Sequence, residues 1–187
     1  MPSSSTVRTD DVMPQPWRNG GGETRELLAH PAGDAWRVRV SVADVVADGP
    51  FSTFPDVARW FAVIEGAGVV LSVDGVEHRC TRASEPLAFA GDAETRSRLI
   101  DGPTRDLNLM LRGVGGAMHC VVPGVTFRPE TRECGLYATV AGPVRIPPST
   151  DHAPIPAHAL RWWSSAPESL AFDGAGWWLS ADLAPAT

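Results

Sequence analysis

Short runs in which apolar and polar residues alternate make up most of the chain. Residues 36–42 show the pattern most plainly, because four apolar side chains fall at every second position and share one face of an extended strand. Asp74-Gly75 suits a type I′ turn, so the runs on either side of it are expected to form a hairpin. By the same reasoning, strands are expected over residues 36–42, 60–64, 69–73, 76–80, 107–111, 119–122, 135–140, 144–146, 160–163 and 177–179.

Glycine and proline interrupt these runs and leave little room for long helices. The 187 residues include 18 glycines and 17 prolines, and both residues weaken helix interiors. Many short strands between turn signals are typical of a β-sandwich or β-barrel. The pattern restarts after a glycine cluster at 113–116. We therefore expect one β-half over residues 12–113 and a smaller β-half over 117–183, the latter packed as one compact unit. Residues 1–11 are expected to be flexible, because they contain few large apolar side chains.

The charge and composition of the chain argue against some classes of binding partner. The net charge of −6 argues against nucleic acid or an anionic membrane, both of which require a basic face. No apolar run is long enough to span a membrane, and the polar N-terminus does not resemble a signal sequence. Cys80, Cys120 and Cys134 form no C-x-x-C motif and are expected to be reduced thiols. These features favour a cytoplasmic protein.

Three of the expected strands carry polar side chains on one face. The sets are Arg59, Phe61, Val63 and Glu65; Asp106, Asn108, Met110 and Arg112; and Arg37, Arg39 and Ser41. In an antiparallel sheet such faces commonly meet solvent. In a small barrel, one face of each strand instead points into a lumen that can hold a ligand. Both interpretations are compatible with these strands alone.

Residues 17–26 read WRNGGGETRE, a segment that can be either a solvated surface loop or the lining of a polar pocket. The segment resembles the W-[KR]-N-G-G-G-x-T-R-E opening of the HutD/Ves family, small cupin-like proteins linked to bacterial histidine utilisation. Four further motifs resemble those of the family in the same order, so the resemblance covers roughly residues 14–112. They are DGPFSTFP at 48–55, IEGAG at 64–68, FAGD at 89–92, and the glycine, aspartate, asparagine and methionine of GPTRDLNLM at 102–110.

The resemblance implies an all-β protein of two fused cupin-type β-barrels, a bicupin, with little helix. It also implies a cytosolic, metal-free protein that binds a small carboxylate of histidine breakdown, such as formylglutamate or urocanate. Arg59 is the first candidate for anchoring that carboxylate. In the alternative interpretation, Arg59 forms a structural ion pair with Glu65 instead. The candidate ligand-binding residues are Trp17, Asn19, Thr24, Arg59, Asp106 and Asn108. Arg25 could contribute to the site or form a salt bridge with Asp92 or Asp106.

The sequence contains none of the common motifs for catalysis or metal binding. The five histidines are isolated, without an H-x-H pair, so neither a metal nor another cofactor is expected. There is no G-x-S-x-G elbow and no G-K-[ST] after the glycines, so no residue is assigned a catalytic role. We therefore favour a non-enzymatic binding or regulatory protein. The alternatives are a metal-independent cupin isomerase or hydrolase acting on a small carboxylate, and an interaction protein with a vestigial pocket.

The second half contains two pairs of adjacent tryptophans, Trp162-Trp163 and Trp177-Trp178. Neighbouring residues on a strand face opposite ways, so one member of each pair is expected in the core of this half. The other member is expected at an interface, which makes a homodimer possible.

Overall fold

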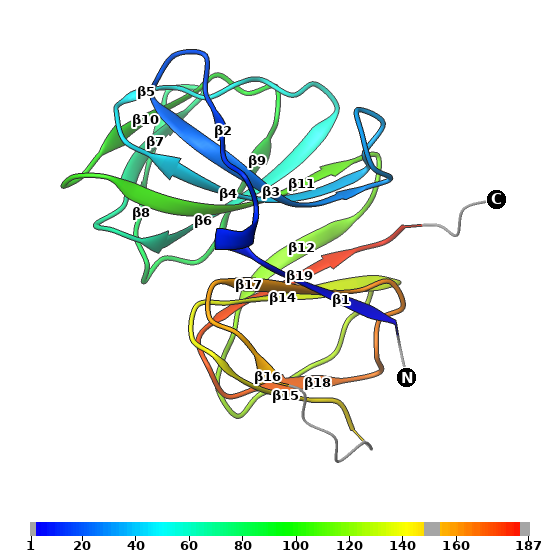
Figure 1. Cartoon of the computed structure of the whole chain (residues 1–187). Coiled ribbons are helices and arrows are strands. Elements are labelled where there is room, and N and C mark those ends of the chain that lie inside the picture. The colour runs from blue at the N-terminus through cyan, green and yellow to red at the C-terminus, as the bar shows by residue number, and fades with distance from the viewer. Residues whose placement is uncertain (1–2, 148–153, 184–187) are drawn as a thin grey trace. The chain divides into compact units, whose positions relative to one another are not determined.

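The computed structural model describes residues 3–147 and 154–183, and within them the chain is built almost entirely of β-strands (Figure 1). The one helical element in these ranges is the 3-10 turn η1 (Thr9–Asp11). The all-β fold expected from the sequence is thereby confirmed. The chain divides into two compact units. The first unit is Met13–Gly113, and the second combines the described residues before Met13 with those after Gly113.

The first unit contains two antiparallel sheets. The six-stranded sheet has the order β2 (Gln15–Pro16), β3 (Gly22–His30), β4 (Val38–Val45), β11 (Thr104–Arg112), β6 (Val57–Glu65) and β9 (Leu87–Ala90). The four-stranded sheet has the order β5 (Gly49–Pro50), β10 (Thr95–Leu99), β7 (Val69–Val73) and β8 (Val76–Cys80). Asp74 and Gly75 both have positive φ between β7 and β8, as the expected type I′ hairpin requires.

Strand register brings the polar face of the six-stranded sheet together. Asn108 on β11 lies opposite Ser41 on β4 and Phe61 on β6. Phe61 packs in a buried cluster with Val69 and Leu71 of the four-stranded sheet. The face that carries Asn108 is therefore turned toward the other sheet of the unit.

The second unit also contains two sheets. One has the order β1 (Ser4–Arg8), β17 (Ala159–Trp163), β14 (Glu133–Ala138), β19 (Gly176–Ala181) and β12 (Gly116–Cys120). The other has the order β13 (Thr126–Phe127), β18 (Leu170–Phe172), β15 (Gly142–Arg145) and β16 (Pro154–Ile155). Trp163 and Trp178 lie in the apolar core between these sheets, as expected for one member of each tryptophan pair. The ring of Trp178 is stacked on that of Phe127, with 4.8 Å between the ring centres.

The N-terminal segment differs from the flexible stretch that its composition suggested. Residues 4–8 form β1, which pairs with β17 along its whole length, and only residues 1–2 of the segment lie outside the described residues. Thr9 is fully buried, and its hydroxyl lies 3.1 Å from that of Tyr137. Main-chain hydrogen bonds along a sheet edge require no apolar side chains, so hydropathy could not reveal this strand.

No sheet closes into a barrel in the ranges that the structure describes. Two edge strands of the first unit are short, since β2 and β5 are each two residues long and end in proline, at Pro16 and Pro50. Proline has no N–H group to donate, so within sheets it is commonly found on edge strands. Each unit is thus a pair of open sheets around an apolar core.

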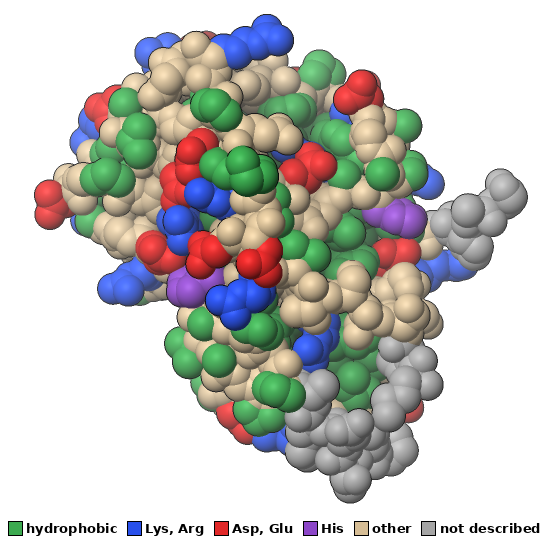
Figure 2. Space-filling model, viewed as in Figure 1, with side chains coloured by type: hydrophobic (Ala, Val, Ile, Leu, Met, Phe, Trp, Pro, Cys, Tyr) green, Lys and Arg blue, Asp and Glu red, His purple; other side chains and the backbone are tan. Residues whose placement is uncertain are grey.

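Charged side chains are mixed on the face drawn in Figure 2, where acidic and basic groups alternate with apolar ones instead of forming one basic patch. No helix among the described residues has both the length and the apolar character needed to cross a membrane.

Candidate functional site

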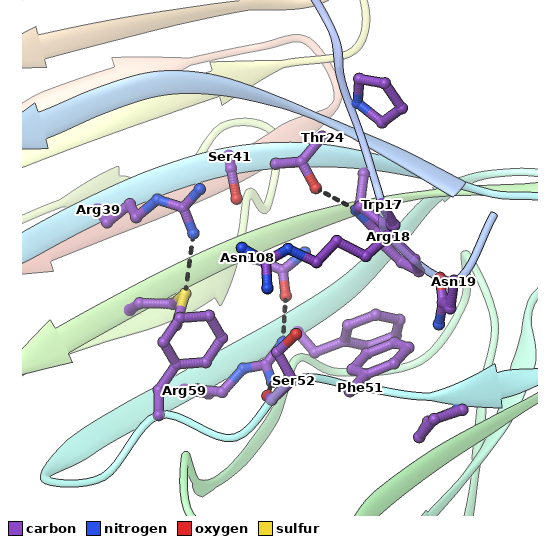
Figure 3. A pocket seen from close by; sticks show the side chains of 16 residues that line it. Trp17, Arg18, Asn19, Thr24, Arg39, Ser41, Phe51, Ser52, Arg59 and Asn108 are labelled. Carbon is purple, nitrogen blue, oxygen red and sulfur yellow. Dashed lines mark hydrogen bonds between the residues drawn. The ribbon is translucent and has the colours of Figure 1, made fainter. Parts of the chain in front are cut away.

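A cavity of about 510 Å³ opens in the first unit. Its side chains come from five strands of the six-stranded sheet, from β5 of the other sheet, and from the loops that follow β2 and β5 (Figure 3). The lining residues are Pro16, Trp17, Arg18, Asn19, Thr24, Arg39, Ser41, Ala43, Pro50, Phe51, Ser52, Phe54, Arg59, Phe61, Asn108 and Met110. The lining therefore includes three arginines but no aspartate or glutamate.

Arg59 contributes a buried cation to this lining. Its side chain leaves β6 on the face shared with Phe61, and the residue is only 6% exposed. One terminal nitrogen donates to Asn108 Oδ1 at 3.2 Å, and the other donates to the Ser52 carbonyl at 3.3 Å. Arg59 Nε is buried without a hydrogen-bond partner. Both acceptors are neutral, so the hydrogen bonds leave the positive charge uncompensated.

Aromatic rings surround the Arg59 guanidinium in place of a carboxylate. Its central carbon lies 5.3 Å from the ring centre of Phe51, 5.6 Å from that of Phe54 and 5.1 Å from that of Phe89. Ring faces attract cations and hold the guanidinium in place. Burial and, to a smaller extent, the nearby positive charge of Arg39 together lower the pKa of Arg59 to about 10. Even so, Arg59 remains protonated at neutral pH.

Neutral donors complete the same face. The Asn108 oxygen is used by Arg59, which leaves the Asn108 amide nitrogen available to a ligand. Trp17 Nε1 donates to Thr24 Oγ1 at 2.8 Å, so the Thr24 hydroxyl has its own proton to donate (Figure 3). This bond also holds the Trp17 ring, which makes an edge-to-face contact with Phe51. The cavity thus combines hydrogen-bond donors with flat aromatic walls.

The glycines of the 17–26 segment have separate structural roles. Gly20 has a φ of +72°, a conformation that favours glycine in the turn after Trp17. At Gly22, an added Cβ would lie 2.2 Å from the Asp44 carbonyl oxygen, so only glycine allows β3 to approach β4 this closely. Asn19 Oδ1 accepts the Gly21 N–H at 3.0 Å and closes the turn. The segment is therefore a shaped edge of the cavity.

Five of the six predicted ligand-binding residues, Trp17, Asn19, Thr24, Arg59 and Asn108, line the cavity. Asp106 does not, and this corrects the prediction. Asp106 lies opposite Val63, which belongs to the apolar core between the sheets, and it is completely buried. Its Oδ1 accepts the Thr104 hydroxyl at 3.2 Å, whereas Oδ2 has no partner. Burial raises the pKa of Asp106 well above its ordinary value, although the Thr104 hydrogen bond opposes the shift.

Glu65 and Arg25, for which the sequence left an ion pair open as an alternative, have other partners in the structure. A β-bulge between Arg105 and Asp106 shifts the register, so that Glu65 lies opposite Arg105 and binds it at 3.3 Å instead of pairing with Arg59. Arg25 faces away from Thr24 and the cavity, and it pairs with Glu23 at 2.8 Å and with Asp44. The alternative in which Glu65 neutralises Arg59 is therefore wrong.

Several lining residues were not chosen from the sequence. Phe51, Ser52 and Phe54 belong to the motif at 48–55 and lie in a loop, where no strand periodicity indicates which way a side chain points. Arg39 and Met110 were placed on the correct strand faces but were not assigned to the site. Met110 shares its strand face with the candidate Asn108, and Arg39 shares its own with Ser41, so alternation along these strands could have identified both residues.

The lining has no His, Cys, Tyr, Asp or Glu, so its hydroxyl groups have no ordinary general base beside them in the lining. Among the residues that the structure describes, no group of three or more His, Cys, Asp or Glu side chains is arranged to hold a metal ion. The arginines, neutral donors and aromatic walls of the cavity can bind a small anion that also carries a planar group.

Fold and site together define an all-β protein with a cationic cavity in its first unit. The chain belongs to the HutD family, whose model matches residues 9–174. This family is linked to the histidine-utilisation locus.

Three similar proteins illustrate the relationship. An uncharacterised 21.2 kDa protein from the hutC 3′ region of Pseudomonas putida is 36% identical over 106 residues, which are 56% of this chain and 56% of that protein. In this match the chain thus spans little more than half of that relative's length. Protein Ves from Cronobacter sakazakii is 29% identical over 155 residues, which are 82% of this chain and 83% of Ves. The solved structure of HutD from Pseudomonas fluorescens has a TM-score of 0.82 and 28% identity, and the match covers 96% of this chain and 98% of that one.

Proposed function

We infer that this chain is a non-enzymatic binding protein that regulates histidine utilisation. In this proposal the cavity of the first unit holds a small carboxylate metabolite similar to formylglutamate or urocanate. The two units are then the two cupin-type halves of a bicupin, of which the first carries the ligand, and the protein acts in the cytoplasm.

The observation that carries the proposal is the uncompensated charge of Arg59. A buried charge without a partner of opposite sign is strongly destabilising. Arg59 lies at the cavity with two neutral acceptors and no carboxylate within salt-bridge distance in the described parts of the chain. A ligand carboxylate would supply the missing negative charge, and Asn108 and Thr24 could donate to its oxygens.

The size and walls of the cavity agree with such a ligand. A volume of about 510 Å³ lies within the usual range of small-molecule sites, roughly 300–1,000 Å³. Trp17 and Phe51 offer flat surfaces against which a conjugated or amide group can lie.

Calorimetric titration with formylglutamate, urocanate and glutamate tests the proposal, using the wild type and Arg59→Ala. A hydrogen bond to a charged group contributes roughly 1.5–3 kcal/mol. Loss of Arg59 should therefore weaken binding by roughly 10- to 150-fold. No binding of any of the three compounds to the wild type would remove the proposal.

The alternative of a metal-independent isomerase or hydrolase is tested in parallel. No lining residue provides an ordinary general base, so we expect unchanged substrate after prolonged incubation of each compound with the protein. Product formation that is lost in Arg59→Ala would favour the enzyme. The absence of a resident metal stays a prediction, which elemental analysis of the purified protein would test.

A further inference from the structure

The cavity contains a second arginine whose charge, unlike that of Arg59, is balanced. Met110 on β11 lies opposite Arg39 on β4 and Arg59 on β6, so the two arginines flank one residue on the same face of the sheet. Both line the cavity. Their backbones are two strand spacings apart, roughly 10 Å. Their charges interact, because Arg39 contributes to the lowered pKa of Arg59.

The partner of Arg39 is Glu26. Arg39 Nε donates to Glu26 Oε2 at 2.6 Å, and one terminal nitrogen contacts Met110 Sδ at 3.7 Å. Glu26 lies opposite Ser41 on β4 and therefore on the cavity side of β3, although it is not itself part of the lining. The side chains of Arg39 and Glu26 are 17% and 37% exposed, so their pairing is only partly screened by water. One of the two cations beside Met110 is thus neutralised by the protein itself.

We propose that Glu26, by pairing with Arg39, makes the cavity selective for ligands that present a single carboxylate to Arg59 and Asn108. This inference rests on the proposed function and narrows its ligand class to urocanate-like compounds, because formylglutamate carries two carboxylates and urocanate only one. A second carboxylate reaching toward Arg39 would meet a pair of zero net charge and would lose its hydration without a matching gain. A neutral acceptor, such as an amide or imidazole nitrogen, meets no such penalty there, because Arg39 can still donate a hydrogen bond.

Crotonate and fumarate are suitable probes, because they share a flat four-carbon skeleton and differ in the group at one end, a methyl or a second carboxylate. Titration calorimetry at pH 7.5 gives the ratio of their affinities for wild type, Glu26→Gln and Glu23→Gln. Glu23→Gln is the matched control. It removes the same charge from the same strand, on the opposite face, where Glu23 pairs with Arg25.

The wild type is expected to bind crotonate at least as tightly as fumarate. Glu26→Gln should shift the affinity ratio toward fumarate by roughly five- to twentyfold, the effect of uncovering one half-buried charge. Glu23→Gln should leave the ratio within about twofold of the wild type, since Glu23 lies on the face of β3 that points away from the cavity and its charge is screened over that distance. Adding Arg39→Gln to Glu26→Gln should restore the wild-type ratio. Unchanged thermal midpoints would show that the variants remain folded.

The outcomes separate this inference from the proposed function. If both probes bind the wild type and Glu26→Gln leaves their ratio unchanged, carboxylate binding stands and the role of Glu26 is wrong. An equal shift in Glu23→Gln would also overturn it, because the effect would then be one of net charge. If neither probe binds the wild type at millimolar concentration, carboxylate recognition by this cavity fails and the inference fails with it.

Discussion

Arg59 on β6 donates a hydrogen bond of 3.2 Å to Asn108 on the neighbouring strand β11, and both residues are 6% exposed. The partner of this buried cation is thus an amide, where a carboxylate would have balanced the charge. Asparagine and aspartate have nearly the same shape, so position 108 could have supplied that charge without a change in packing. Among the described residues, the hydrogen bonds of Arg59 therefore leave its charge without a carboxylate partner, as the proposed binding of a ligand carboxylate requires.

The first prediction concerns Asn108→Asp. The new carboxylate should pair with Arg59, raise the thermal midpoint of the ligand-free protein and repel a ligand carboxylate. We expect urocanate affinity to fall by at least about tenfold, or 1.4 kcal/mol. Gln15→Glu is the control, because it places the same charge on the exposed strand β2 outside the lining and should change affinity by less than about threefold. Tight urocanate binding by Asn108→Asp would contradict the role given to Arg59.

Asp106 provides a prediction about pH. Its pKa is raised by burial, so the folded chain keeps a proton on Asp106 that the unfolded chain releases above a pH of about 3.9. Asp106 therefore stabilises the fold less and less as the pH rises from about 4 toward its folded-state pKa, by up to about 1.4 kcal/mol per pH unit.

Asp106→Asn should remove that dependence. The stability of Asp106→Asn relative to wild type should increase between pH 4.5 and pH 7.5, as measured by thermal midpoints at both values. Asp101→Asn, at an exposed position, should show no such change relative to wild type. A difference between Asp106→Asn and wild type that is the same at both pH values would show that the buried carboxyl does not titrate abnormally.

Sequence alternation predicted much of this site, within a definite physical limit. The period of two placed Arg59 with Phe61, Asn108 with Met110, and Arg39 with Ser41, and each pair lines the cavity. The same reasoning failed past residue 63, where the β-bulge inserts one extra residue on β6 and turns Glu65 to the other face. A bulge is set by the pairing of two strands and leaves no periodic signal in either.

Alternation along strands could not predict the cavity residues that lie in loops. Phe51 and Phe54 contact Arg59 from a segment without regular structure, where alternation does not say which way a side chain points. The pairing of β1 with β17 joins residues about 155 positions apart, and local composition carries little information on such a contact.

Gly22→Ala tests the close approach of β3 to β4. The added methyl group would lie 2.2 Å from the Asp44 carbonyl oxygen, which is backbone and cannot move aside independently. Overpacking of this kind costs typically 1–3 kcal/mol, so the thermal midpoint should fall by several degrees. Gly115→Ala, where an added Cβ meets nothing within 4 Å, should change it little. Equal midpoints in the two variants would show that β3 can shift to accommodate a side chain.

The most direct test of the account is the stability of Arg59→Met with and without urocanate. Methionine fills a similar volume without the uncompensated charge, so the ligand-free variant should be more stable than wild type by about 1 kcal/mol. Urocanate at about a hundred times its dissociation constant should stabilise the wild type by about 2.7 kcal/mol. Arg59→Met should therefore be more stable than wild type without urocanate and should gain no stability when urocanate is added. Equal stabilisation of both proteins by urocanate would contradict this prediction.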